Sequence, residues 1–144
     1  MSEDKIIRYS FRAPWVDCDP AGIMYFSHLL KYVEFAEFEL YRKLRANARL
    51  MLDEFNILLP RVEVHSTFFH PIRWEDLVQV HLRVARLTRR SVTYEFAFFG
   101  SETPEVLLNG RLTVVCVDRD KFRAVPFPPP LYDLLNAHYV ADET

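Results

Sequence analysis

The chain lacks the features that define several classes of protein. None of its apolar runs approaches the roughly 20 residues that a membrane-spanning helix needs. Its 18 lysines and arginines are outnumbered by 20 aspartates and glutamates, and a net charge of −2 provides no general positive field for nucleic acid or an anionic membrane. We therefore expect no nucleic-acid partner and no membrane partner.

Cysteine is scarce, and metal-binding patterns are missing. Cys18 and Cys116 stand far apart in the chain, and neither they nor the five histidines show the spacing of metal ligands. The first residues, Met-Ser-Glu-Asp-Lys, do not lead into the apolar core of a signal peptide. These observations predict a cytoplasmic protein with free thiols and no bound metal.

Two common nucleophiles also lack support. The Gly-x-Ser-x-Gly motif of many serine hydrolases does not occur. Cys18 is flanked by Asp17 and Asp19, whose negative charges disfavour a thiolate. Any hydrolytic chemistry therefore has to come from another side chain.

Apolar and aromatic residues, in contrast, are abundant. They make up 50% and 15% of the 144 residues, a composition that is not typical of a disordered chain. A chain of this length can bury a sizeable core within one domain. We expect a single domain spanning residues 1–144.

The first quarter of the chain changes from strand periodicity to helix periodicity. Ile7, Tyr9 and Phe11 alternate with polar residues and predict a strand over residues 5–16, with Pro14 confining its end to an edge or a bulge. A stripe of apolar residues at helical spacing then predicts one long helix over residues 27–50, with Ser27 as its N-cap. A short further turn is expected over residues 51–55.

The rest of the chain is rich in strand patterns. Four further strands are predicted, over residues 61–70, 76–89, 91–100 and 105–118. Breaks at residues 89–91 and 100–101 indicate hairpins, and a short helix is expected over residues 131–138. The order of elements predicts an α+β fold, in which a curved antiparallel sheet wraps around a single helix. Some aromatic residues are not needed for this core, and they favour the packing of a second copy of the chain against the first.

The segment between the first strand and the long helix carries the chemistry. Residues 17–26 read Asp-Cys-Asp-Pro-Ala-Gly-Ile-Met-Tyr-Phe, which places two carboxylates one short turn before a helix. A carboxylate there can act as a base or as a nucleophile, while the unpaired N–H groups of the helix terminus can hold a developing oxyanion.

This segment resembles a known signature. Residues 16–23, Val-Asp-Cys-Asp-Pro-Ala-Gly-Ile, are similar to that of the 4-hydroxybenzoyl-CoA thioesterases, a branch of the hotdog-fold acyl-CoA thioesterases. The order of elements agrees, and Phe-Phe-His-Pro at 68–71 followed by Asp76 looks like the family's strand–turn–strand junction. The resemblance covers roughly residues 5–120. It implies a hotdog fold, homodimers or tetramers of dimers, and hydrolysis of acyl-CoA thioesters without metal or organic cofactor.

The resemblance also implies roles for individual residues. The catalytic acid is Asp19, and the donor that polarises the thioester carbonyl is a backbone N–H at about Phe26. A helix acid that faces the acyl group falls at Glu34. Basic residues near a hairpin meet the CoA phosphates, and the matching positions here are Arg89, Arg90 and Ser91. One bacterial branch carries His at the position of Phe26, so this chain lacks any role of that imidazole.

Several readings of these residues stay open. Asp19 can attack the carbonyl or deprotonate a water, and an Asp before Pro20 is also a common turn former. Gly22 permits either a special backbone geometry or a close ligand approach. The rings of Tyr25 and Phe26 suit an aryl or a medium-chain acyl group.

Asp17 and Glu34 have plain structural readings, a loop-stabilising acceptor and an exposed ion-pairing residue. Two other functions share the scaffold, a non-catalytic acyl-CoA-binding module and a 3-hydroxyacyl thioester dehydratase. The first needs no acid at position 19, and the second normally pairs a His with an acid, for which only His28 is near. We therefore favour an acyl-CoA thioesterase.

Overall fold

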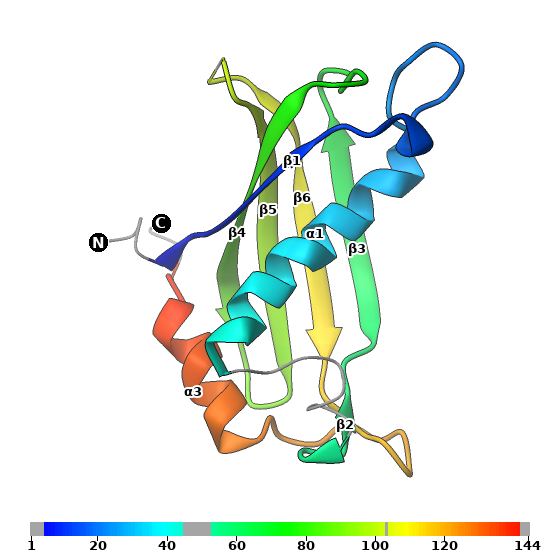
Figure 1. Cartoon of the computed structure of the whole chain (residues 1–144). Coiled ribbons are helices and arrows are strands. Elements are labelled where there is room, and N and C mark those ends of the chain that lie inside the picture. The colour runs from blue at the N-terminus through cyan, green and yellow to red at the C-terminus, as the bar shows by residue number, and fades with distance from the viewer. Residues whose placement is uncertain (1–4, 45–52, 103, 142–144) are drawn as a thin grey trace.

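The chain folds around one amphipathic helix that lies across an antiparallel sheet (Figure 1). The computed structural model describes residues 5–44, 53–102 and 104–141. Helix α1 (Phe26–Tyr41) covers one face of five strands in the order β1-β4-β5-β6-β3. These strands are β1 (Ile7–Arg12), β3 (Arg61–Phe68), β4 (Leu77–Leu87), β5 (Ser91–Gly100) and β6 (Val106–Val115). The predicted α+β fold is confirmed.

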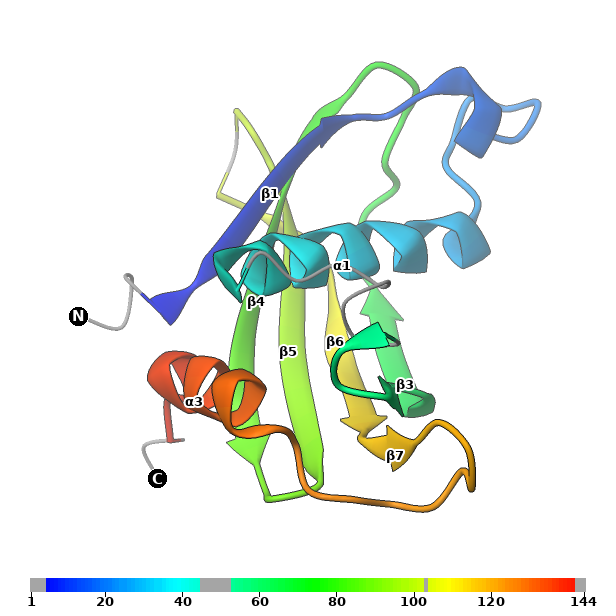
Figure 2. The ribbon, with the colours of Figure 1, turned by 60° about the horizontal axis from the view of Figure 1, so that its bottom comes forward.

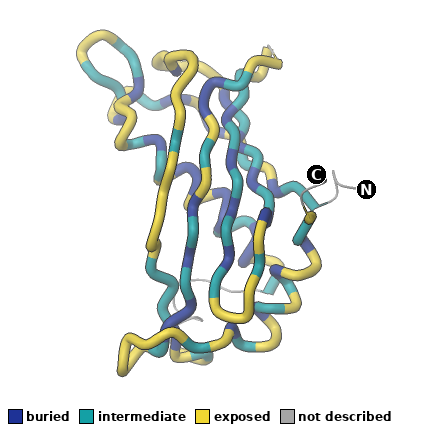
Figure 3. The backbone as a smooth tube through the Cα atoms, turned by 180° about the vertical axis from the view of Figure 1, so that it is seen from behind, coloured by how far each residue is buried: buried dark blue, intermediate teal, exposed yellow. Residues whose placement is uncertain are grey.

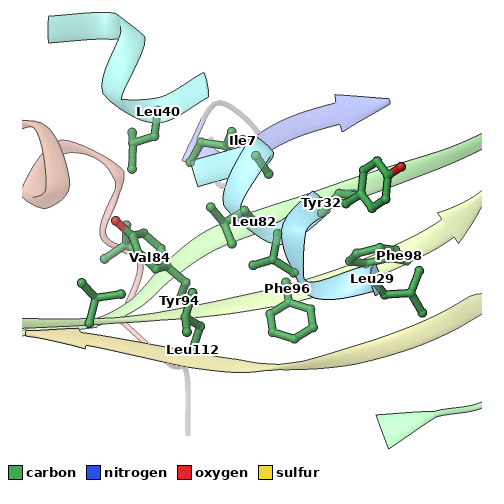
Figure 4. Packing of buried hydrophobic residues seen from close by; sticks show 14 of the residues in the cluster. Ile7, Leu29, Tyr32, Leu40, Leu82, Val84, Tyr94, Phe96, Phe98 and Leu112 are labelled. Carbon is green, nitrogen blue, oxygen red and sulfur yellow. The ribbon is translucent and has the colours of Figure 1, made fainter. Parts of the chain in front are cut away.

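The core lies between α1 and the inner face of the sheet. Along β5 every second residue from Val92 to Phe98 is buried, as period-two alternation requires for a sheet with one covered face. From α1, Leu29 and Leu40 pack onto these strands, because they lie on one side of the helix (Figure 4). Val33 belongs to the same buried cluster. The opposite face of the sheet carries polar side chains.

Two small elements complete the described structure. Strands β2 (Ile57–Leu58) and β7 (Val117–Asp118) form a separate two-stranded sheet, and α3 (Pro129–His138) packs against β4 on the same side as α1 (Figure 2). The helix predicted at residues 131–138 is confirmed. In the part of the chain that the structure describes, no helix is long and apolar enough to cross a membrane.

The strand predicted over residues 105–118 is wrong at its last three residues, 116–118. It breaks after Val115, because the N–H of Cys116 donates to the carbonyl of Arg90 in the β4–β5 hairpin, 2.8 Å away. The carbonyl of Cys116 accepts from Val125, so the chain leaves the large sheet at this residue. The two residues that follow pair with β2 instead.

The ends of the first two predicted elements also differ. Ser27 is not an N-cap, because α1 begins at Phe26 with Tyr25 in the cap position. The N–H of Tyr25 donates to the carbonyl of Asp17, which fixes the cap two residues before the predicted position. β1 ends before Pro14, and residues 15–17 form a 3₁₀ turn. Helix α1 ends at Tyr41 with a 3₁₀ turn to Leu44, and residues 45–52 of the predicted helix and turn lie outside the described residues.

The contact between α1 and the sheet predicts a graded response to truncation of leucines. Leu40 is fully buried, whereas Leu77 at the start of β4 is 40% exposed. We expect Leu40→Ala to lower the free energy of unfolding by about 3 kcal/mol, since it removes buried methyl groups and leaves a cavity. Leu77→Ala, the matched control, should cost less than about 1 kcal/mol. Equal losses in urea denaturation would contradict this placement of the core.

Candidate active site

The loop between β1 and α1 is a tight hairpin closed by backbone hydrogen bonds. Cys18 and Met24 form a bridge, and the N–H of Asp19 donates to the carbonyl of Ile23 over 2.9 Å. At its tip Gly22 adopts φ +78°, a conformation that side chains disfavour. A Cβ at Gly22 would meet nothing within 4 Å. Of the two roles expected of Gly22, the backbone geometry is therefore the one that the loop itself requires.

Asp19 holds this turn together. Its Oδ1 accepts the N–H of Ala21 at 2.9 Å and the N–H of Ile23 at 3.2 Å. Both hydrogen bonds fall on the same oxygen, and no described residue hydrogen-bonds to Oδ2. The turn-forming reading is thus present in the structure, and it leaves one carboxylate oxygen available for chemistry.

Asp17 ties the loop to the first turns of α1. Its carboxylate is buried and accepts hydrogen bonds from the hydroxyl of Tyr32 and the ammonium of Lys31, each 2.5 Å long. The Nδ1 of His28 lies 3.2 Å from the same carboxylate. Since all three partners come from α1, this carboxylate fixes the position of the loop relative to the helix, as its structural reading anticipates.

The protonation of Asp17 follows from these contacts. Burial acts to raise the pKa of its carboxyl, but the hydrogen bonds from Lys31 and Tyr32 and the charge of Lys31 outweigh burial and lower the pKa below its usual value. Asp17 is therefore a carboxylate at neutral pH. Burial and the neighbouring Asp17 raise the pKa of the Tyr32 phenol, which stays a hydrogen-bond donor.

The loop delivers the chain to the amino terminus of α1 at Phe26. The N–H groups of the first turn have no acceptor within the helix, and the helix dipole makes this end positive. The position predicted for the carbonyl-polarising N–H is therefore a helix terminus. The ring of Phe26 is 70% exposed and meets Phe68 edge-on at 6.3 Å, while the ring of Tyr25 lies 5.1 Å from His28.

An apolar cleft of about 320 Å³ begins one turn further along α1. It runs between the helix and strands β3, β5 and β6. Its volume is at the lower end of the range for ligand pockets. Its walls are Leu30, Lys31, Val33, Glu34, Arg61, Val64, Phe96 and Leu112. Glu34 lies at the rim with its side chain 48% exposed, so both of its expected roles fit its place in the structure.

A hollow of about 460 Å³ lies on the opposite face of the sheet. There Glu95 forms ion pairs with Arg83 and Arg111, and none of the described residues that line the hollow belongs to a helix. An open polar sheet face is normal for an antiparallel sheet with one side covered. The smaller cleft beside α1 is the better candidate, because α1 forms one of its walls and its wall residue Lys31 contacts Asp17 in the loop.

Arg89, Arg90 and Ser91 lie at the other end of the molecule. The loop follows β1 at the Leu77 end of β4, where the N–H of Ala13 donates to Asp76, and the hairpin lies at the other end of β4 (Figure 1). Eleven strand residues span about 36 Å. One copy of the chain does not bring the hairpin and Asp19 together.

Sequence reasoning missed Arg61, which contributes to the cleft. Its guanidinium pairs with the buried Glu37, and its Nη2 lies 3.8 Å from Glu34. Nothing in the sequence signals this pairing, since Arg61 and Glu37 are 24 positions apart. Glu37 itself gives a weak signal, because it falls beside the apolar stripe of α1.

A helix on an antiparallel sheet, with a carboxylate-bearing loop before it and an apolar cleft beside it, is the arrangement of a hotdog-fold thioesterase. A sequence profile described as the thioesterase-like superfamily matches residues 13–135. The chain belongs to this superfamily, and the family predicted from the signature is confirmed.

Relatives in sequence carry related names. The chain is 25% identical over 129 residues to a 1,4-dihydroxy-2-naphthoyl-CoA hydrolase of Microcystis aeruginosa, covering 89% of this chain and 91% of the relative. This name agrees with the predicted class of enzyme, a hydrolase of CoA thioesters.

Solved structures share the fold. One is a 1,4-dihydroxy-2-naphthoyl-CoA thioesterase from Synechocystis, with a TM-score of 0.85, 19% identity, and coverage of 91% of this chain and 96% of that one. Another is a mutant 4-hydroxybenzoyl CoA thioesterase complexed with 4-hydroxybenzoyl CoA, with a TM-score of 0.81, 19% identity, and coverage of 91% and 99%. The hotdog fold is therefore confirmed.

The contacts of Asp17 predict a pH-dependent effect of its removal. We expect Asp17→Asn to lower the free energy of unfolding at pH 7 by about 3 kcal/mol, because Lys31 and Tyr32 lose a buried charged acceptor. Because the pKa of Asp17 is lower in the folded state, its carboxylate stabilises the fold at pH values above the unfolded-state pKa of about 3.9. This stabilisation is lost as the pH falls through the folded-state pKa. The difference between variant and wild type should therefore shrink below about pH 4.

Urea denaturation across this pH range measures the effect, with Asp133→Asn on the exposed side of α3 as control. A difference that stays constant down to pH 2 would show that the charge of Asp17 contributes nothing.

Proposed function

We propose that the protein hydrolyses the CoA thioester of a hydroxylated aromatic acid, with its thioester carbonyl at the start of α1. The observation that carries the proposal is the junction of the Asp19 turn, the helix terminus at Phe26 and the apolar cleft. The names of the relatives support the substrate class, since they are 1,4-dihydroxy-2-naphthoyl-CoA and 4-hydroxybenzoyl CoA enzymes. The acyl group would occupy the cleft beside α1, with Gly22 and Tyr25 at its mouth.

The helix terminus supplies the electrophilic half of the reaction. The N–H of Phe26 would donate to the thioester oxygen, which becomes negative as a nucleophile adds to the carbonyl carbon. The helix dipole favours that charge, and a fixed backbone donor needs no reorganisation as the charge develops. Phe26 thus acts through its backbone, and its ring can pack against the substrate.

Asp19 supplies the other half, by one of two routes. In the first, its Oδ2 attacks the carbonyl carbon, the C–S bond breaks, CoA leaves as a thiolate, and water hydrolyses the resulting anhydride. In the second, Asp19 takes a proton from a water whose oxygen attacks the same carbon, the C–S bond breaks, and the thiolate of CoA leaves and takes up the proton. Both routes use the oxygen that the turn leaves without a hydrogen bond.

We infer a homodimer, because the hairpin and Asp19 of one copy are too far apart to bind the same substrate. Strand β3 is an exposed edge of the sheet (Figure 3). Its apolar residues Val62, Val64 and Phe68 are about half exposed. Such an edge is a template for pairing with another strand. A two-fold axis across β3 would invert the partner and bring its hairpin end to the level of this chain's loop. Arg89, Arg90 and Ser91 of one copy would then bind the CoA phosphates at the Asp19 of the other.

Removal of the proposed acid tests the mechanism. We expect Asp19→Asn to reduce hydrolysis of 4-hydroxybenzoyl-CoA by at least about 100-fold, since it removes the nucleophile or base. Release of CoA is followed with a thiol reagent, and Asp133→Asn serves as the control. The turn should persist, because an amide oxygen can still accept from Ala21 and Ile23. Turnover of the folded variant near the wild-type rate would remove Asp19 from the mechanism.

Substitution of Arg89 and Arg90 by Ser tests the phosphate site. Guanidinium groups suit phosphate oxygens, so we expect KM for the CoA ester to rise about tenfold, with little change for the pantetheine ester, which lacks the nucleotide. Equal losses on both esters would contradict the assignment.

Mixing this variant with Asp19→Asn tests where the hairpin comes from. If each site combines two copies, half of the dimers are mixed and one of their two sites is intact, so about a quarter of the wild-type activity returns. Recovery no greater than the sum of the two separate variants would place both groups in one copy.

A further inference from the structure

Arg61 is fixed at the inner end of the cleft by an acid that water does not reach. Glu37 is fully buried on α1, and Arg61 reaches it from the start of β3 with both terminal nitrogens, in a bidentate ion pair. The hydroxyl of Tyr41 donates to the same carboxylate and lies 2.9 Å from the hydroxyl of Tyr94. A buried carboxylate needs such partners, so Arg61 cannot move away without leaving the buried Glu37 without its positively charged partner.

The guanidinium nevertheless keeps a donor for another acceptor. Its Nη1 donates to Glu37 and to the carbonyl of Leu59, 3.0 Å away, which uses both N–H groups of that nitrogen. Its Nη2 donates to Glu37 with one N–H and lies 3.8 Å from the Oε1 of Glu34. That distance is too long for a hydrogen bond. An oxygen placed about 2.8 Å from both atoms would close the gap, provided that it can accept from Arg61 and donate to Glu34.

A hydroxyl group meets both conditions, and other end groups do not. A carboxylate could accept from Arg61, but it has no proton for Glu34. It would also lie beside two acids, Glu34 and Glu37, that share Arg61, while Lys31 in the same wall is already paired with Asp17. An aliphatic or unsubstituted aromatic end leaves the donor and the acceptor without a partner from the ligand. The pair Arg61–Glu34 therefore selects for a neutral hydroxyl.

The spacing along α1 sets where that hydroxyl lies on the acyl group. Phe26 and Glu34 are eight residues apart, which is about 12 Å along a helix. The N–H of Phe26 points out of the helix terminus, whereas the carboxylate of Glu34 lies further along α1, so the thioester carbonyl and the gap between Arg61 and Glu34 lie at opposite ends of the acyl group. On an aromatic ring, a hydroxyl opposite the carbonyl points toward this gap, whereas a hydroxyl beside the carbonyl stays near the helix terminus.

We propose that Arg61, held by the buried Glu37, is a specificity-determining residue that binds, together with Glu34, a hydroxyl at the far end of the acyl group. The inference rests on the proposed function, because it takes the thioester carbonyl to lie at Phe26. It adds a residue, and a position on the ring, that the signature does not specify. Arg61 makes no contact with the reacting atoms and acts on recognition alone.

The test compares three substrates that differ only at the ring. These are 4-hydroxybenzoyl-CoA, 2-hydroxybenzoyl-CoA and benzoyl-CoA. The wild type should show the highest kcat/KM for the first and similar, lower values for the other two. Arg61→Lys keeps a positive charge for Glu37 but loses the fork, so the preference for the 4-hydroxyl should fall about tenfold. Arg42→Lys, at an exposed ion pair with Glu39 beyond the end of α1, is the matched control.

The outcomes separate the inference from the function. If Arg61→Lys lowers kcat/KM for all three substrates equally, Arg61 is only structural and the inference is overturned. An unchanged preference overturns it as well, and in both cases the proposed function stands. A wild type that hydrolyses none of the three overturns both. If Arg61→Lys does not fold, the double variant Arg61→Met with Glu37→Leu removes the buried pair together, and the same loss of preference is required of it.

Discussion

The buried carboxylate of Asp17 is the constraint on which the site depends. It accepts from two side chains of α1 and lies beside a third, and its backbone carbonyl accepts the N–H of Tyr25. These contacts fix where the helix begins. They also fix the turn that carries Asp19, since that turn starts two residues later. A charged group is costly to bury without donors, so the loop has a strong preference for this one position.

The sequence predicts those parts of the fold that depend on local patterns. Residues 91–98 alternate, and β5 has the predicted bounds, Ser91–Gly100. Helix α3 is found where it was predicted, although it begins two residues earlier, at Pro129, because a proline is tolerated in the first helical turn. The predictions fail where a distant contact decides. Cys116 leaves the sheet because its N–H meets Arg90 of another hairpin, and β2 exists only through its pairing with β7. In both cases the partner is far away in the sequence, so the local pattern around these residues does not predict the contact.

The same division holds for the site. The signature locates Asp19, Gly22 and Phe26 because they are close in sequence and share one loop. It gives no sign that the carboxylate of Asp19 is half committed to its own turn, which depends on the path of the backbone. The helix pattern places Lys31 outside the apolar stripe of α1. In the structure it hydrogen-bonds to Asp17 and lines the cleft. Arg61 is beyond any local pattern, since its partner Glu37 is on another element.

The exposed apolar residues make sense only together with the open side of the cleft. Val64 belongs both to the wall of the cleft and to the exposed edge of β3, and Phe68 at the far end of that strand touches Phe26. A single copy leaves these side chains in water, at a cost in free energy that burial would recover. A partner paired along β3 would cover them and close the cleft in the same step. Under the proposed function, assembly and substrate binding therefore use one continuous surface, which explains why an enzyme of this size would keep an apolar strand at its edge.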